Sequence, residues 1–292
     1  MTNPWRDIEA AIREAIAAPF FIESRAVAGS GISDYYCVRS KSLSCFVKVG
    51  GADKADMFAA EAAGLEEIAH AHAVRVPKPL CHGANRDTSW LVLEHLELRP
   101  ADERAMRTLG ANLACMHRLT RDHYGWSRNN TIGSTLQVNT PSDDWVKFWR
   151  ERRLGFQLGL AQSRGHGRLM AGGDRLLEKL PAFFKGYRPL PSLLHGDLWS
   201  GNSAMLPGGE PLIYDPALYY GDRESDLAMT ELFGGFPPSF YEAYRAEYPL
   251  DPGYEIRKPL YNLYHVLNHL NLFGGGYGAQ AEHMIERLLA HA

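Results

Sequence analysis

Apolar residues in the first part of the chain switch between helical and strand-like spacing. Isoleucines recur every fourth position within residues 1–18 among charged neighbours, which predicts an amphipathic helix and differs from the apolar core of a signal peptide. Residues 20–29 and 35–49 predict short β segments, and a turn of small residues at 29–33 separates them. The expected order is strand, glycine-containing turn, strand.

A second helix is predicted over residues 52–71, where Met57, Leu65 and Ile68 recur at helical spacing. Residues 90–93 form a short apolar run that predicts a buried strand. The first part of the chain is therefore expected to be rich in β-structure.

The remainder of the chain has mostly helical periodicity from residue 101 onward. Loops are expected at residues 121–143 and 163–173, and residues 192–215 contain short apolar runs broken by Gly and Pro. Residues 259–289 return to a helical pattern.

Together these elements predict an α+β chain with two lobes that pack as one unit. The small β-rich amino-terminal lobe spans residues 1–96, and the larger, mainly helical lobe spans residues 97–292. With 45% hydrophobic and 22% charged residues, the 292-residue chain can bury a large core. A cleft between two such lobes is a suitable place for a nucleotide.

Composition narrows the classes of function. The net charge of −3, without a long basic run, gives no electrostatic footprint for nucleic acid or an anionic membrane. No apolar stretch approaches the roughly 18 residues of a membrane helix. Cys37, Cys45, Cys81 and Cys115 are widely spaced, which favours reduced thiols over a zinc site or a disulfide framework. We expect a cytoplasmic protein acting on a small molecule, with a monomer as the default state.

The strongest chemical signal is the spacing His195-x-Asp197-x4-Asn202, followed thirteen residues later by Asp215 at the end of an apolar run. This is the spacing of a kinase catalytic loop, in which Asp197 would take the proton of a substrate hydroxyl and Asn202 and Asp215 would bind Mg²⁺. An isolated His-Gly-Asp could equally be a structural loop with a helix-capping aspartate. Asn202 and Asp215 favour the kinase interpretation, in which His195 braces the loop.

The amino-terminal lobe contains matching residues. Lys48 lies within an apolar strand, as a lysine that binds ATP phosphates requires, and Glu61 follows on the helical stripe of Met57. A buried carboxylate needs a partner, so Lys48 and Glu61 are expected to pair. An exposed lysine on an edge strand is the alternative for Lys48 alone.

Two backbone segments are candidates for nucleotide contacts. Gly29, Ser30 and Gly31 precede the lysine strand at the position of a phosphate-covering loop, although a simple hairpin turn also fits. Glu94 and Leu96 fall where the lobes would join, so their backbone could hydrogen-bond an adenine edge.

Other polar groups fit structural roles. Residues 222–226 either begin a solvated helix or, through Asp226, tie down the catalytic loop. His265 and His269 are four residues apart on a helix, but a zinc-protease glutamate and a third ligand are absent, so packing is expected. The glycines at 274–276 predict the end of that helix.

The chain resembles the fructosamine (ketosamine) 3-kinase family. The similar segments are LLHGDLWSGN (193–202), IYDPALYYGDRESDLAMTELFGGFP (213–237), YNLYHVLNHLNLFGGGY (261–277), FVKV (46–49), VRVPKPL (74–80), LVLEHLEL (91–98) and GWSRNNTIGSTLQVN (125–139). The resemblance spans nearly the whole chain.

The resemblance implies an aminoglycoside-phosphotransferase-like protein in the protein-kinase-like superfamily. Such an enzyme uses ATP and Mg²⁺ to phosphorylate free or protein-bound ketosamines, which are ribulosamine or fructosamine glycation adducts, on the third sugar carbon. The product is expected to release its amine, which amounts to deglycation. The family pattern assigns the ATP phosphates to Lys48, their support to Glu61, the base to Asp197, Mg²⁺ to Asn202 and Asp215, and the substrate side to Trp199 and Asp222.

Two other classes of function remain open from the sequence. Another small-molecule kinase, for an aminoglycoside, an amino alcohol or a sugar, would share the same loop. A non-catalytic kinase-like binding module would be expected to have lost one of Lys48, Asp197, Asn202 or Asp215, and all four are present.

Overall fold

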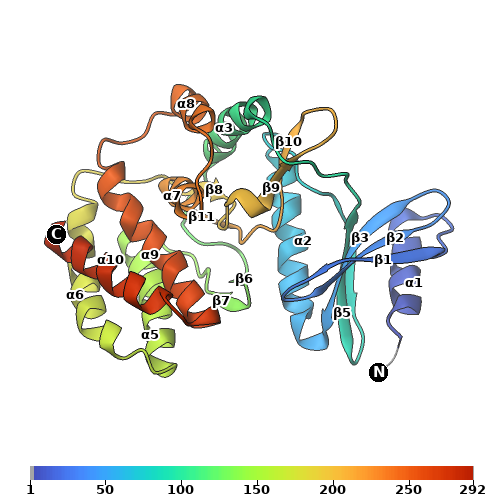
Figure 1. The fold of residues 1–292 in the computed structure, drawn as a ribbon, viewed down its shortest axis with the longest axis horizontal. Helices are drawn as coiled ribbons and strands as arrows, with labels where there is room; N and C mark the ends of the chain where they lie inside the picture. The colour runs from blue at the N-terminus through green and yellow to red at the C-terminus, as the bar shows by residue number, and fades with distance from the viewer. Residues whose placement is uncertain (1–2, 292) are drawn as a thin grey trace.

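The computed structural model describes residues 3–291 and has a β-sheet at one end and a mainly helical body at the other (Figure 1). The sheet is antiparallel, with strand order β1-β2-β3-β5-β4. Its strands are β1 (Ser24–Ser30), β2 (Asp34–Arg39), β3 (Ser44–Gly51), β4 (Pro79–Ala84) and β5 (Thr88–Glu94). This arrangement confirms the predicted β-rich amino-terminal part.

Helices cover both faces of the sheet, because the alternate side chains of a strand point to opposite faces. Helix α1 (Trp5–Ile16) packs on one face in a cluster that includes Val92. Helix α2 (Ala55–His70), which follows the short 3-10 turn η1 (Ala52–Lys54), packs in the main core with Leu91 and Leu93. Figure 1 shows α2 between the sheet and the helical body. Helix α2 therefore packs against both the sheet and the helical body.

Two predictions in this part were wrong in detail. The segment 35–49 forms two strands, β2 and β3, because the polar residues after Arg39 make a turn in which Ser40 N donates to Leu43 O at 2.9 Å. Strand β4 was not predicted. It lies at the edge of the sheet and begins with Pro79, a residue that edge strands tolerate and that weakens a strand pattern.

The helical body confirms the expected α+β class. Its helices are α3 (Glu103–His117), α4 (Trp145–Phe148), the π-helical turn η2 (Trp149–Leu154), α5 (Gly155–Ser163), α6 (Arg168–Phe183), α7 (Glu224–Leu232), α8 (Pro238–Glu247), α9 (Tyr254–Phe273) and α10 (Tyr277–His291). Short strands pair as β6 (Asn130–Ile132) with β7 (Thr135–Gln137), β8 (Ser192–Leu194) with β11 (Tyr219–Gly221), and β9 (Ser203–Met205) with β10 (Pro211–Ile213). The 3-10 turn η3 covers Ser200–Asn202.

Helix boundaries differ from the predictions where glycine occurs. The predicted loop 163–173 contains the start of α6. The helical glycines Gly172 and Gly173 are packing positions, since a Cβ there would lie 2.9 Å from the Ile285 side chain and 2.8 Å from the Leu158 side chain, respectively. The predicted helix 259–289 is divided into α9 and α10, and Gly274 ends α9 as expected. Within residues 3–291, the helices lack the combination of length and apolar composition needed to cross a membrane.

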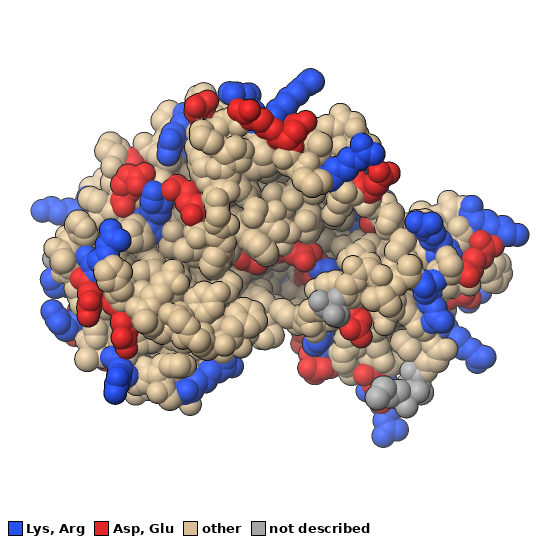
Figure 2. Space-filling view, in the orientation of Figure 1, with Lys and Arg blue, Asp and Glu red and all other residues tan. Residues whose placement is uncertain are grey.

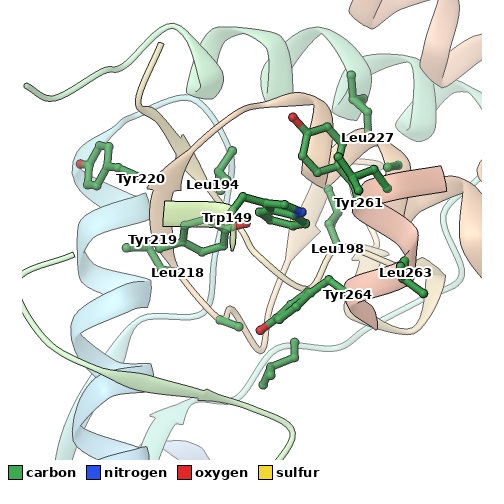
Figure 3. Close-up of a cluster of buried hydrophobic side chains, with 14 of the residues drawn as sticks. Trp149, Leu194, Leu198, Leu218, Tyr219, Tyr220, Leu227, Tyr261, Leu263 and Tyr264 are labelled. Carbon is green, nitrogen blue, oxygen red and sulfur yellow. The ribbon is translucent and has the colours of Figure 1, made fainter. Parts of the chain in front are cut away.

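An aromatic core supports the strands that lead to the polar cleft. Figure 3 shows Trp149, Tyr219 and Tyr261 converging beside β8 and β11. All three side chains are nearly inaccessible to solvent, and the rings of Trp149 and Tyr261 meet edge to face with centroids 4.9 Å apart. Such close packing restricts the positions of the two strands.

Candidate active site

A cavity of about 470 Å³ lies between the sheet with α2 and the helical body. Figure 2 shows the hollow between the two parts of the molecule, with acidic and basic atoms within it. Its lining brings together five of the predicted site residues from distant parts of the chain: Lys48, Glu61, Asp197, Asn202 and Asp215. Trp199 also lies at this cavity.

Lys48 links the two lobes electrostatically. Its Nζ lies 2.8 Å from Glu61 Oε1 on α2 and 2.6 Å from Asp215 Oδ1, and the residue is only 5% exposed. Burial alone would lower the pKa of Lys48, but the charges of Asp215 and Glu61 outweigh burial and raise it. Lys48 is therefore a fixed cation inside the cavity, and the predicted pairing with Glu61 is present.

His195 braces the loop that carries Asp197. Its Nδ1 accepts a hydrogen bond from Asp197 N at 3.2 Å, so its Nε2 carries the proton that it donates to Tyr214 O at 2.9 Å. Burial lowers the pKa of His195, which keeps the ring neutral. Both ring nitrogens are used inside the protein, and neither is available for proton transfer to a ligand.

Asp226 ties down the catalytic loop, which decides between the two alternatives for residues 222–226. Its carboxylate accepts hydrogen bonds from His195 N at 2.7 Å and Gly196 N at 2.8 Å, and His117 Nε2 lies 3.2 Å away. Burial alone would raise the pKa of Asp226, but these partners lower it. The carboxylate is therefore a buried anion that holds the loop backbone.

Backbone contact also joins the catalytic loop to the segment after Asp215. Ala217 N donates to His195 O at 2.9 Å. Gly196 has φ +82°, and a Cβ there would lie 2.1 Å from Ala217 O. Only glycine fits this position, because both the conformation and the close approach exclude a side chain.

Asp197 and Asn202 meet directly at the floor of the cavity. Asn202 Nδ2 donates to Asp197 O at 2.8 Å and lies 3.3 Å from Asp197 Oδ2. Burial, followed by the negative charge of Asp215, raises the pKa of Asp197 to about 7. A carboxylate in this condition can exchange a proton near neutral pH, as a general base does.

The remaining oxygens suit a hard cation. Asn202 lines the cavity and its Nδ2 atom is engaged, so Oδ1 is the amide atom left to bind a cation, and Asp215 Oδ2 makes no hydrogen bond within residues 3–291. Over the same residues there is no group of three or more His, Cys, Asp or Glu side chains able to hold a metal. Mg²⁺ commonly needs only one or two protein oxygens, with waters and phosphates completing its shell. The donor set therefore fits Mg²⁺ together with a phosphate ligand.

Several predicted nucleotide contacts lie outside this cavity. Among the described residues, its lining includes Ile32 and Ser33 from the β1–β2 turn but not Gly29, Gly31, Glu94 or Leu96. Gly31 N donates to Ser33 O at 2.9 Å, as in a tight hairpin. For Ser30 only the backbone in β1 is described.

The Glu94 carboxylate is occupied by protein groups. It accepts hydrogen bonds from Arg75 Nη2 and Lys78 N, each at 2.6 Å. Its side chain therefore fixes the segment between α2 and β4 to the end of β5, and its backbone role toward adenine stays a prediction.

Asp222 requires a correction, because the structure does not bring it to the cavity. The residue is fully buried, and its carboxylate accepts hydrogen bonds from Tyr187 OH at 2.9 Å and from Tyr261 OH. Glu224 N donates to the same carboxylate at 3.0 Å. Asp222 organises the start of α7 and is not available to hydrogen-bond a substrate.

Sequence reasoning missed the wall opposite the phosphate side. This wall, called the α9 wall below, consists of Phe233 at the end of α7, Tyr277 at the start of α10, and His265, Asn268, His269, Leu272 and Phe273 on α9. The α9 members recur at helical spacing, so they share one face of the helix. That spacing of His and Asn was visible in the sequence, but only the fold shows that the face borders a cavity.

His265 is a deeply buried polar residue of the α9 wall, second only to Asn268. It is 4% exposed, and its ring nitrogens make no hydrogen bond within residues 3–291. Burial lowers its pKa to about 3, so the ring is neutral and can both donate and accept. Trp199, 38% exposed, lies on the same cavity.

Known proteins resemble this chain along its whole length. A family model described as fructosamine kinase matches residues 4–291. A probable ketoamine kinase of Synechocystis sp. is 46% identical over 98% of this chain and 97% of its own. The chloroplastic protein-ribulosamine 3-kinase of Oryza sativa subsp. japonica is 40% identical over 90% of this chain and 78% of its own.

Solved structures agree with this similarity. A candidate fructosamine-3-kinase from Haemophilus somnus superposes with a TM-score of 0.91 at 29% identity, covering 98% of this chain and 97% of its own. A candidate aminoglycoside phosphotransferase from Ralstonia eutropha, at 13% identity and a TM-score of 0.62 over 98% of this chain and 97% of its own, shares the fold. The match of the family model and the identity to curated relatives place the chain in the fructosamine kinase family.

Proposed function

We propose that this protein is an ATP-dependent kinase that phosphorylates the 3-hydroxyl of ketosamines. The observation that carries the proposal is one cavity in which Lys48 bridges Glu61 and Asp215 beside the half-buried carboxylate of Asp197. Phosphoryl transfer to a hydroxyl needs a cation that binds the phosphates, here Lys48, next to a carboxylate that can take the hydroxyl proton, here Asp197 with its raised pKa. Membership in the fructosamine kinase family and the similarity to a probable ketoamine kinase and a protein-ribulosamine 3-kinase support the choice of acceptor.

In the proposed reaction, Lys48 Nζ holds phosphate oxygens of ATP while the acceptor hydroxyl points at Asp197. The hydroxyl oxygen forms a bond to the γ-phosphorus as the bond to the β,γ-bridging oxygen breaks, and Asp197 takes the hydroxyl proton. Asn202 Oδ1 and Asp215 would hold Mg²⁺, which neutralises charge on the β- and γ-phosphates when bound. The backbone of Gly29, Ser30 and Gly31 over the phosphates, and of Glu94 and Leu96 at adenine, completes the proposed nucleotide site.

The chemistry of the product gives the reaction a purpose. The ketone of a ketosamine is on the second sugar carbon, so a phosphate on the third carbon is bound next to the carbonyl. Enolisation toward the first carbon, which carries the amine, places a double bond beside the third carbon, and inorganic phosphate is expelled. Water then hydrolyses the resulting imine and releases the amine. Phosphorylation would convert a stable glycation adduct into a labile one.

The α9 wall favours a ketosamine over a polycationic aminoglycoside. Within the described residues, the acidic members of the cavity lining are Glu61, Asp197 and Asp215, all of which belong to the phosphate side. The acceptor side offers aromatic rings, neutral imidazole and amide groups instead. Such a surface suits a sugar with few charges, because aromatic faces pack on sugar rings and neutral polar groups bond hydroxyls.

A coupled ADP-release assay tests this function. The substrates are ribulosyl-lysine, fructosyl-lysine, free ribose and an aminoglycoside, with Asp197→Asn as the matched inactive control. We expect ribulosyl-lysine to be used at least as well as fructosyl-lysine, and both far better than ribose. Ribose lacks the amine and would leave polar groups of the site without a partner, which costs more binding free energy than the one carbon unit by which the two ketosamines differ. If ribose gives the highest kcat/KM, the protein is a sugar kinase on the same fold.

A cytoplasmic location, a monomeric state and the division at residues 96 and 97 belong to the same proposal. Gel filtration of the purified chain tests the oligomeric state. Limited proteolysis around residue 96, followed by mass spectrometry, tests the lobe boundary.

A further inference from the structure

Helix α2 is tied to the helical body at a point outside the cavity. Glu67 lies six residues beyond Glu61 on α2, about 9 Å farther along the helix axis. Its Oε1 accepts hydrogen bonds from Tyr220 OH and Arg121 Nη2, each at 2.7 Å, and its Oε2 accepts one from Trp126 Nε1 at 2.7 Å. All three donors belong to the helical body.

The two buried donors give this junction its strength. Tyr220 and Trp126 are 6% exposed each, and hydrogen bonds to a carboxylate are stronger than neutral ones. Burial raises the pKa of Tyr220 to about 12, so the phenol keeps its proton and donates a hydrogen bond to Glu67. Arg121 is 61% exposed, and as a surface ion pair it contributes less.

The donors lead directly to the catalytic segments. Tyr220 lies on β11, five residues after Asp215, and it pairs with Leu193 on β8, two residues before His195. Gly125, the neighbour of Trp126, exchanges two backbone hydrogen bonds of 2.8 Å with Tyr220. Through Tyr220, Glu67 thus binds the two-stranded sheet of β8 and β11, which leads to both Asp215 and the catalytic loop.

Further contacts along α2 also hold this helix against the helical body. Arg128 Nη1 donates to Ala59 O at 3.2 Å, near the start of the helix. At Gly64, halfway between the two glutamates, a Cβ would lie 3.4 Å from Leu218 Cβ and 3.5 Å from Pro216 Cγ, so the helix backbone lies close to the segment after Asp215. The helix that carries Glu61 is therefore held against the residues next to Asp215.

We propose that Glu67 is a positioning residue for phosphoryl transfer. Its carboxylate fixes α2 on the helical body, and α2 fixes Glu61, so that Lys48 Nζ lies between Glu61 and Asp215 before any ligand binds. Glu67 acts through Glu61 and Lys48 and touches no reacting atom. The inference rests on the proposed function for its activity assay.

The variant Glu67→Gln keeps the shape of the side chain but leaves one acceptor oxygen and adds a donor, so Tyr220 or Trp126 faces an NH₂ group. We expect kcat with ribulosyl-lysine to fall by about 10- to 100-fold, as for a misplaced catalytic group. The KM for ribulosyl-lysine should stay within about twofold of the wild-type value, because Glu67→Gln neither adds nor removes a contact to the acceptor. Glu66→Gln, on the exposed face one residue away, is the matched control and should match the wild type.

A double variant separates positioning from stability. If Glu67 acts through Glu61, then Glu67→Gln should change kcat little in a Glu61→Gln background, because the two effects share one route. An equal loss of kcat in both backgrounds, or a fall in Tm with unchanged kcat well below the Tm, would overturn the inference. Should Glu67→Gln fold poorly, Tyr220→Phe removes a single donor and is expected to give a smaller loss of kcat in the same direction.

Calorimetry of Mg-ATP binding keeps this inference separate from the proposed function. A wild-type enzyme inactive on every ketosamine would disprove the proposed acceptor. A weaker Mg-ATP affinity in Glu67→Gln than in Glu66→Gln would still support the positioning role, because Lys48 would have moved. Equal affinities would contradict it.

Discussion

The two sides of the cavity are built from opposite kinds of side chain. On the phosphate side, Lys48, Glu61 and Asp215 are charged and in direct contact. On the α9 wall, His265 and its neighbours are neutral or aromatic, and the ring nitrogens of His265 have no partner within residues 3–291. The phosphate side is thus organised before a ligand arrives, whereas the α9 wall keeps polar groups that a ligand could satisfy. Variants on the two sides should separate catalysis from acceptor choice.

The largest effect is expected from Asp215→Ala. This change removes the carboxylate that pairs with Lys48 and would hold Mg²⁺, so the Mg²⁺-dependent part of nucleotide binding should be abolished. Isothermal titration calorimetry with ATP, with and without Mg²⁺, measures the Mg²⁺-dependent part of the affinity. Unchanged Mg-ATP affinity would count decisively against the role of Asp215.

Asp197→Asn should cut kcat by about 10²- to 10⁴-fold while Mg-ATP affinity stays near that of the wild type, because the base acts mainly in the transition state. Rapid-quench measurement of phosphoryl transfer checks the first part, and titration calorimetry checks the second. Turnover like that of the wild type in a folded variant would remove Asp197 from its role.

The pH dependence gives a smaller but sharper test. With the pKa of Asp197 raised to about 7, kcat/KM should fall about tenfold per pH unit below that value, because the protonated acid cannot take the hydroxyl proton. The effect on stability has the opposite sign. A raised carboxyl pKa stabilises the fold at acid pH, and this contribution is lost as pH rises from about 4 through 7. Asp197→Asn should therefore show a higher Tm than the wild type at pH 8 and no advantage at pH 4.

The smallest effect is expected on the α9 wall. His265→Phe removes the neutral imidazole, and kcat/KM for ribulosyl-lysine should fall by roughly 3- to 10-fold, the cost of one hydrogen bond. Mg-ATP affinity should not change. The control is His283→Phe, the same change at an exposed position on α10. If His265→Phe weakens Mg-ATP binding as much as acceptor use, the two sides are not separate.

The phosphate side could be predicted from the sequence because its chemistry is tied to spacing. The interval from Asp197 to Asn202 and the lone lysine in an apolar strand are local patterns, and the structure brings all their members to one cavity. Local spacing also predicted the two parts of the fold. It failed for β4, an edge strand beginning with Pro79, and for the start of α6, where packing glycines resembled loop residues.

The α9 wall and Asp222 could not be predicted in the same way. Whether His265 faces a cavity and Asp222 faces tyrosines depends on contacts between segments far apart in the sequence. A charged residue near a catalytic motif looks similar in sequence whether it binds a ligand or is sealed in the core. The three donors around Glu67 illustrate the same limit, since they come from residues 121–126 and from β11, two segments far from Glu67 in the sequence.

The attachment of α2 to the helical body has a consequence for how the molecule melts. The apolar residues of α2 and those of the helical body belong to one core, and Glu67 seals its edge with hydrogen bonds to Tyr220 and Trp126. The sheet therefore cannot separate from the helices without exposing this core to water. Scanning calorimetry should accordingly show a single cooperative transition, with the van't Hoff enthalpy equal to the calorimetric enthalpy.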